Sequence, residues 1–269
     1  MRWSEWKTSF EGRRDRPLPP IGDVTEIPPD WREPLAASLA RFQLGETGEG
    51  RVVADLRRRA ASWGIHPDYL ESLRLFIAEE GRHAAILGVA VQALGGQTLR
   101  RTWSATAFGR VRRVAGPGLE LLVLLAAEVA ALTFYGTLVD RLPRGPLRAA
   151  LQQIASDESM HVRFHVAFLG SALPSPLVRR AVATAWSGLG LLAGTVIAID
   201  HGRTLRELGV TQRAVLKRAR GLVVDIDDAI ATAVPSSLEA TGAAAAWGLV
   251  DRHSASAVAS GSPAAGRPS

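Results

Sequence analysis

The stretch Leu121–Tyr135 reads LLVLLAAEVAALTFY, and Glu128 is its only charged residue. An apolar run of this length predicts a helix that is buried on all sides. A carboxylate at the centre of such a helix cannot reach water, so Glu128 should meet a cation, a cluster of hydrogen-bond donors or a proton. The alternative is a transmembrane helix with a functional acid, and the uncharged stretch Ala181–Ile199 is also long enough to span a bilayer.

Two other segments contain the motif Glu-x-x-His within expected helices. They are Glu79-Glu80-Gly81-Arg82-His83 and Asp157-Glu158-Ser159-Met160-His161. Residues three apart share one face of a helix, so the Glu and His of each motif can reach the same metal ion. A single motif of this kind arises often by chance on a solvated face. Two of them, each preceded by a second carboxylate in an otherwise apolar helix, predict a metal site.

The position of Pro143 indicates that two of these acids meet. Glu128 and Glu158 each lie fifteen residues from this proline, where the chain is expected to turn between two helices. At the helical rise per residue, both acids stand roughly 22 Å from the turn. The spacing therefore predicts that Glu128 and Glu158 lie at the same level of an antiparallel hairpin.

A second predicted hairpin turns between Gly64 and Ile65 and supplies another acid. The residue level with Glu80 across this turn is Glu49. Glu46 lies one helical turn earlier on the same stripe and is the alternative, because a small shift of the turn exchanges the two.

The predicted ligand set combines four carboxylates with two imidazoles. Its members are Glu49, Glu80, His83, Glu128, Glu158 and His161. Carboxylates with one imidazole per metal suit Fe(II) or Mn(II), and four carboxylates balance the charge of two divalent ions. Zinc prefers four-coordinate sites rich in nitrogen and sulfur, and the chain contains no cysteine. The expected cofactors are two iron ions, with manganese as the alternative.

Neighbouring residues could support this site. Glu79 and Asp157 could accept hydrogen bonds from the ligand imidazoles or could lie exposed. His165 follows the second motif by one helical turn, so it could be a seventh ligand or a packed histidine. Tyr135, near the end of the apolar helix, could be a pocket hydroxyl or a core residue.

The order Glu, Glu-x-x-His, Glu, Glu-x-x-His over residues 35–170 resembles that of the ferritin-like di-iron carboxylate proteins. The form of residues 79–83 looks like that of the oxygen-activating branch, which includes bacterial multicomponent monooxygenases and ribonucleotide reductase small subunits. The second motif departs from this form, with Met160 in place of Arg. The resemblance implies that Glu80 and Glu158 bridge or lie between the irons, and that each motif histidine ligates one.

The resemblance also implies a di-iron oxidoreductase whose metal centre is itself the catalyst. Such a protein activates O2 to hydroxylate, N-oxygenate or desaturate a small organic substrate, and it needs an electron donor such as a reductase or ferredoxin. The alternative is iron oxidation and storage, or peroxide scavenging, without an organic substrate. A structural bundle whose acids are only salt-bridged is a third reading, although carboxylates at one level would repel each other.

The composition, rich in Ala, Leu, Val, Arg and Glu, predicts an all-α chain, and the resemblance implies a ferritin-like four-helix bundle. Two antiparallel hairpins with a long crossover are expected from helices at 34–62, 67–94, 119–142 and 146–170. Two extra C-terminal helices are expected at 176–202 and 211–233, within a helical domain over 34–235. Residues 1–33 predict a Pro-rich arm with no helix before Pro34. Residues 236–269, rich in Ala, Gly and Ser, predict a disordered tail.

The formal net charge of +6 comes from short basic clusters without interleaved aromatic residues, which favours a solvated basic face over nucleic-acid binding. No apolar segment follows the charges at the N-terminus, so a secretory signal is not expected. A cytoplasmic location is the resulting expectation. Membrane contact is not expected, since apolar runs also occur in the buried helices of large bundles. The C-terminal helices could cover the site or form the face of a homodimer.

Overall fold

The computed structural model describes residues 1–47, 54, 57–58, 65–114, 117–173 and 175–232. Over these residues the chain is helical and contains no strand, which confirms the predicted all-α class. Its helices are α1 (Trp3–Arg14), α2 (Pro29–Glu46), α4 (Pro67–Ala93), α5 (Trp103–Val114), α6 (Pro117–Arg141), α7 (Pro146–Ala172), α8 (Pro176–Asp200), α9 (Gly202–Glu207) and α10 (Gln212–Thr232). The predicted tail 236–269 lies outside the described residues. Gly64, the first residue of the predicted turn, also lies outside them.

Proline and glycine set most of the helix boundaries. Five helices, α2, α4, α6, α7 and α8, begin at a proline. A proline is well tolerated there because the first N–H groups of a helix have no partner within it. Ser175 caps α8 by accepting a hydrogen bond from the N–H of Val178. Gly95, with φ of +82°, follows the end of α4 in the left-handed conformation that favours glycine.

The prediction that no helix begins before Pro34 is wrong. Helix α1 lies at the N-terminus, and it buries Trp3, Trp6 and Phe10, which recur at three- and four-residue steps among charged residues. Helix α2 begins at Pro29 rather than at Pro34, because proline fits the first turn of a helix. Within the predicted arm, only residues 1–2 and 15–28 are free of helix.

The predicted crossover between α4 and α6 also contains a helix, α5. Thr102 caps this helix, since its Oγ1 accepts a hydrogen bond from the N–H of Ala105. The Nε1 of Trp103 and the Oγ of Ser104 both donate to Asp200, at 3.0 and 2.9 Å. The crossover is thereby fixed to the end of α8.

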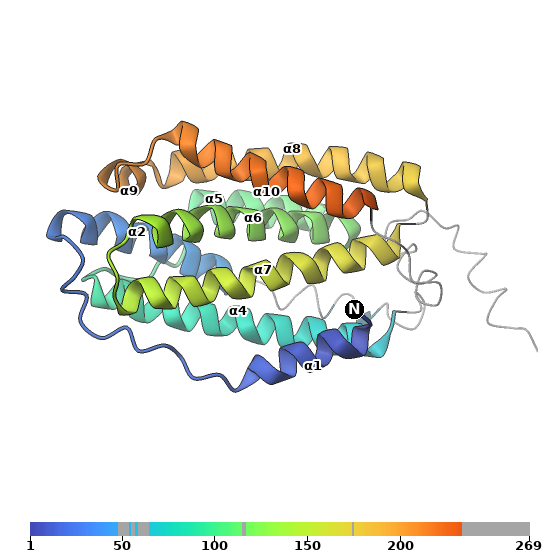
Figure 1. Cartoon of the computed structure of the whole chain (residues 1–269), viewed down its shortest axis with the longest axis horizontal. Coiled ribbons are helices and arrows are strands. Elements are labelled where there is room, and N and C mark those ends of the chain that lie inside the picture. The colour runs from blue at the N-terminus through green and yellow to red at the C-terminus, as the bar shows by residue number, and fades with distance from the viewer. Residues whose placement is uncertain (48–53, 55–56, 59–64, 115–116, 174, 233–269) are drawn as a thin grey trace, which may run out of the picture.

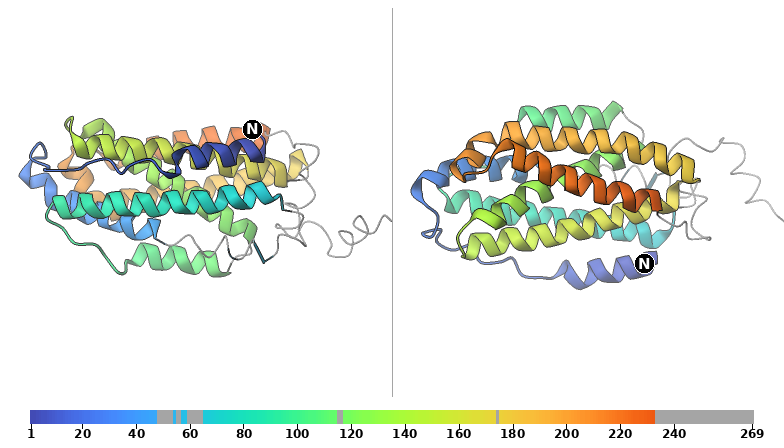
Figure 2. Two further views of the ribbon diagram at one scale, coloured as in Figure 1. Left: turned by 90° about the horizontal axis from the view of Figure 1, so that it is seen from below. Right: turned by 45° about the horizontal axis from the view of Figure 1, so that its top comes forward.

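Helices α4 and α7 face each other near the middle of the molecule (Figure 1). Helix α2 packs on α4, and α6 packs on α7 in an antiparallel pair with a short turn. Helix α1 lies against the outer side of α4, while α8 and α10 pack on each other and cover α6 from the opposite side (Figure 2). The middle sections of α4, α6 and α7 are thereby enclosed.

Two helices are long and apolar enough to cross a membrane, judged by length and composition among the described residues. The most apolar window within Leu121–Arg141 of α6 is 72% buried, and the corresponding window within α8 is 33% buried. A buried core helix passes the same test as a membrane span, so two such helices are weak evidence for membrane insertion.

Candidate metal centre

Four buried side chains from α4 and α7 form a compact cluster. Each offers one ligand atom, and these atoms all lie within 4.8 Å of one another; the residues are Glu80, His83, Glu158 and His161. None of the four is more than 5% exposed. Both Glu-x-x-His motifs therefore meet, and the cluster could hold a metal ion.

The Nδ1 atoms of both imidazoles face the same two carboxylates. The Nδ1 of His161 lies 3.0 Å from Oε1 of Glu80 and 3.0 Å from Oε2 of Glu158. The Nδ1 of His83 lies 3.1 Å from Oε1 of Glu158 and 3.7 Å from Oε1 of Glu80. Glu80 and Glu158 thus lie between the two histidines.

The Nε2 atoms face two outer carboxylates in a crossed arrangement. The Nε2 of His161 on α7 lies 3.1 Å from Glu79 on α4, and the Nε2 of His83 on α4 lies 3.4 Å from Asp157 on α7. Burial disfavours the charged imidazole, but the hydrogen bond to Asp157 and the negative charges of Glu158 and Glu80 raise the pKa of His83 to about 9. Burial likewise opposes ionisation of Glu79, but its hydrogen bond to His161 helps to lower its pKa to about 2.

These contacts decide between the two interpretations of Glu79 and Asp157. Both carboxylates are buried and contact imidazoles, so neither lies on a solvated face. An Nε2–H that donates to a carboxylate leaves the Nδ1 lone pair directed at the cluster, which is the form that a metal-ligating histidine needs.

Two arginines from the N-terminal segment complete this arrangement. Arg13 donates to both oxygens of Glu79, at 3.1 Å each, and Arg16 donates to Asp157 at 3.1 Å. Arg82 fixes the segment by donating to the carbonyl oxygen of Arg13 at 2.7 Å. The sequence predicts neither arginine contact, because the arginines are 66 and 141 residues away from their partners along the chain.

Glu128 lies at the cluster, at the level of Glu158, as the spacing from Pro143 predicts. Its Oε2 is 3.7 Å from Nδ1 of His161, and its carboxylate is buried. Burial and the negative charge of Glu158 raise the pKa of Glu128 well above its usual value. Two carboxylates this close do not both ionise unless a cation separates them.

The acid contributed by α2 within the described residues is Glu46. Its side chain is only partly buried as a whole, but burial of the carboxylate and the charges of Glu80 and Glu158 raise its pKa well above the usual value. Tyr135 donates a hydrogen bond to its Oε1 at 3.0 Å, so this tyrosine is both buried and in contact with the cluster. Glu49, the preferred candidate from the spacing, lies outside the described residues.

His165 approaches the cluster without a hydrogen bond. Its Nε2 lies 3.8 Å from Oε1 of Glu128, and the ring is 1% exposed. Burial lowers the pKa of His165 to about 3, so the ring is neutral at physiological pH.

The donor set fits a divalent metal ion. Within the described part of the chain, Oε1 of Glu80, Oε1 of Glu158 and Nδ1 of His83 are buried and lack hydrogen-bond partners. Buried polar atoms rarely stay unpaired, and these three converge on one volume. A cation bound there would contact all of them and would offset the repulsion between the carboxylates.

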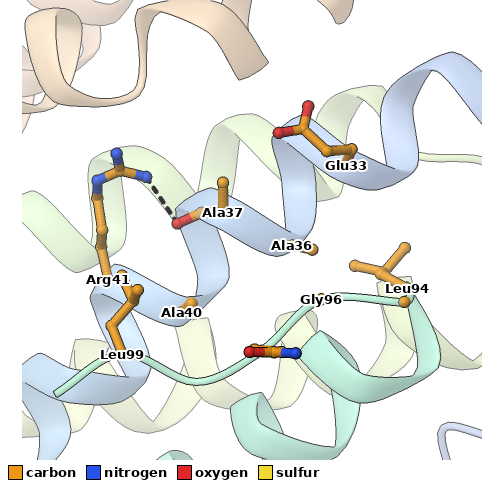
Figure 3. Close-up of a pocket in the computed structure, with 10 residues that line it drawn as sticks. Glu33, Ala36, Ala37, Ala40, Arg41, Leu94, Gly96 and Leu99 are labelled. Atoms are coloured by element: carbon orange, nitrogen blue, oxygen red, sulfur yellow. Dashed lines mark hydrogen bonds between the residues drawn. The ribbon is translucent and has the colours of Figure 1, made fainter.

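A surface pocket of about 300 Å³ lies elsewhere (Figure 3). It is formed by α2 and by the segment that follows α4, and its lining includes Glu33, Arg41 and Leu94. Leu94 is eleven residues beyond His83 and therefore about 16 Å further along the helix. No member of the cluster lines this pocket.

Comparisons with protein-family models, with curated proteins and with solved structures find no match to this chain. The molecule itself is all-helical and contains a buried Glu/His cluster that could bind a metal. Its functional class must therefore be argued from the chemistry of these side chains.

Proposed function

We propose that this chain is a ferritin-like di-iron carboxylate protein that uses O2 to oxidise an organic substrate. The observation that carries the proposal is the convergence of two Glu-x-x-His motifs and two further carboxylates in one buried volume. Four carboxylates and two imidazoles match the charge and ligand preferences of two Fe(II) ions, and Mn(II) is the alternative.

The contacts support one ligand assignment. Both Glu80 and Glu158 lie close to both motif histidines, which suits a position between two ions. Two further carboxylates, Glu46 and Glu128, come from α2 and α6, and Glu128 lies 3.7 Å from His161. The proposed ligands are Glu46 and His83 for one ion, Glu128 and His161 for the other, and Glu80 and Glu158 between them.

The protein would hold these ligands in a fixed and dry arrangement. Arg13 and Arg16 fix the carboxylates that orient the imidazoles. Phe10 stacks on the ring of His161 with centroids 6.2 Å apart, and Phe76 packs against the same ring edge-on at 4.7 Å. Low solvent access strengthens electrostatic interactions within the site and protects reactive species from water.

When bound, two Fe(II) ions would supply electrons for the reduction of O2 and the oxidising power for hydroxylation, N-oxygenation or desaturation of the substrate. The centre must then be reduced again, so a reductase or ferredoxin is the proposed partner. The form of residues 79–83 favours this activity over iron storage.

An anaerobic Fe(II) titration followed by O2 tests this function. We expect binding to saturate at about two irons per chain, which is the number of ions that the ligand set can hold. With excess Fe(II) as the only reductant, oxidation should stop after the bound pair, whereas an added electron donor should sustain O2 consumption. Continued Fe(II) oxidation with a growing ferric mineral would reject the oxygenase function in favour of storage.

Matched variants show whether the cluster is the binding site. Glu158→Gln should lose bound iron, since this residue contacts both motif histidines. Glu71→Gln removes a carboxylate of α4 that pairs with Arg74 instead, and it should bind iron normally. Equal iron content in the two variants would reject the proposed site.

A further inference from the structure

His165 is a buried imidazole without a polar partner. It is 1% exposed, and neither of its ring nitrogens has a hydrogen-bond partner in the described part of the chain. Almost all buried polar groups in folded proteins have such a partner, so this ring requires an explanation. Both ring nitrogens of His83 and of His161 lie closer to a carboxylate oxygen, at 3.0 to 3.4 Å, than Nε2 of His165 does at 3.8 Å.

His165 has phenylalanine rings and one carboxylate, that of Glu128, among its neighbours. Phe76 packs edge-on against the ring at 5.0 Å, and Phe164 lies at 5.6 Å. The Nε2 atom lies 3.8 Å from Oε1 of Glu128, whose other oxygen lies 3.7 Å from Nδ1 of His161. His165 follows His161 by one turn of α7, so both rings lie on the face of the helix that meets Glu128.

We infer that His165 is a third imidazole ligand, bound to the metal ion that Glu128 and His161 hold. This inference rests on the proposed di-metal function. A metal ion would bond to Nε2 of His165, the ring nitrogen that faces Glu128, and would lie between this nitrogen and the Glu128 carboxylate. The alternative is a histidine that merely fills space in the core between two phenylalanines.

The two metal positions are then unequal. One would have the imidazole of His83 together with carboxylates, while the other would have two imidazoles. Imidazole binds Co(II) and Ni(II) better than Mn(II), whereas Mn(II) prefers carboxylates. We therefore expect Co(II) to fill the position with two imidazoles first, and Mn(II) to distinguish less between the two positions.

His165→Leu tests the inference because leucine has a similar volume and no nitrogen. The control is His201→Leu, which alters another buried histidine whose ring packs against Phe42 and Phe134, neither of which is a proposed ligand. Metal-free protein is titrated anaerobically with Co(II), and the visible spectrum of Co(II) and the bound metal per chain are measured. Thermal unfolding of the metal-free variants shows that each is folded.

We expect the wild type and His201→Leu to bind two Co(II) in two distinguishable steps. In His165→Leu, the tighter step should weaken by about tenfold or more, with a changed Co(II) spectrum, since even residues that only support ligands change affinity by 10–100-fold. His165→Gln keeps an atom that can bind a metal, and it replaces His165→Leu if the leucine variant is unfolded. It should weaken the same binding step by less.

Two results would overturn the inference in different ways. If His165→Leu binds two Co(II) with wild-type affinities and spectrum, His165 is a packed histidine and the di-metal function stands. If the wild type binds no metal at this cluster, the proposed function fails and the inference fails with it.

Discussion

Arg13 holds Glu79 by two hydrogen bonds, each 3.1 Å long, and Glu79 in turn lies 3.1 Å from Nε2 of His161. The guanidinium is 13% exposed and the carboxylate 4%, so this pair is largely shielded from solvent. An arginine from the N-terminal helix thereby fixes the orientation of a proposed metal ligand. The docking of α1 and the binding of metal should consequently be coupled.

Arg13→Ala should weaken metal binding without removing any proposed ligand. Loss of the guanidinium frees Glu79 to move and leaves its buried charge without its arginine partner, so His161 is less well oriented. The expected loss is about 10-fold to 100-fold in metal affinity, which is typical of residues that position ligands. Arg14→Ala is the control, because Arg14 is exposed and pairs only with the neighbouring Asp15 among the described contacts. Equal affinities in the two variants, measured by anaerobic titration, would contradict the coupling.

Glu128→Leu should lower the metal content and stabilise the metal-free protein. Burial and the charge of Glu158 raise the pKa of Glu128, so the carboxyl is costly to keep in the core when no cation is present. Buried ion pairs and triads can often be replaced by apolar residues of similar volume with a neutral or stabilising effect of about 1–4 kcal/mol, and leucine at position 128 also removes the repulsion between Glu128 and Glu158. Metal analysis and denaturant unfolding of metal-free protein measure both effects. Full occupancy in this variant would show that Glu128 is not a ligand.

The sequence predicts the central helices because their boundaries are local. Pro67, Pro146 and Pro176 mark helix starts wherever they occur, and Glu-x-x-His places its two side chains on one face whatever the tertiary fold. The level of Glu128 with Glu158 is predictable for the same reason, since one short turn joins their helices.

The arginine contacts could not be predicted, because they depend on where α1 docks. Charged residues separate Trp3, Trp6 and Phe10 in the sequence, so their apolar stripe is weak. The structure shows the role of this stripe, because the rings pack against Tyr69 and Phe164. Sequence spacing within α1 cannot show that this helix packs against α4 and α7. The spacing alone leaves Glu46 and Glu49 as alternatives, because a small shift of the predicted turn exchanges them, and Glu49 lies outside the described residues.

The stability of the metal-free protein should fall as the pH rises from about 6.5 to 9. The pKa of His83 is raised from its usual value of 6.5 to about 9 in the folded state, so the folded protein keeps a proton that the unfolded chain has lost. This contribution is fully present below the unfolded pKa and disappears as pH passes the folded pKa, at up to about 1.4 kcal/mol per pH unit. Urea unfolding across this range measures it, and His83→Gln should flatten the dependence. Metal affinity should rise over the same pH range, because metal binding displaces the proton from His83. A metal affinity that falls with pH together with the stability would contradict the assignment of His83 as a ligand.

Glu46→Ala should reduce the metal content more than Glu49→Ala. Burial and the negative charges of Glu80 and Glu158 raise the pKa of the Glu46 carboxyl. Its carboxylate is therefore close enough to the cluster to balance the positive charge of a second divalent ion. Its loss should leave the ion near His83 with one carboxylate fewer and lower the bound metal toward one per chain. Tyr135→Phe removes only the hydrogen bond to Glu46, so it should weaken binding by less than Glu46→Ala. Metal analysis of the three variants after identical loading and desalting gives the order. A greater loss in Glu49→Ala would transfer the ligand role to Glu49, three residues further along the chain, and would leave the other proposed ligands unchanged.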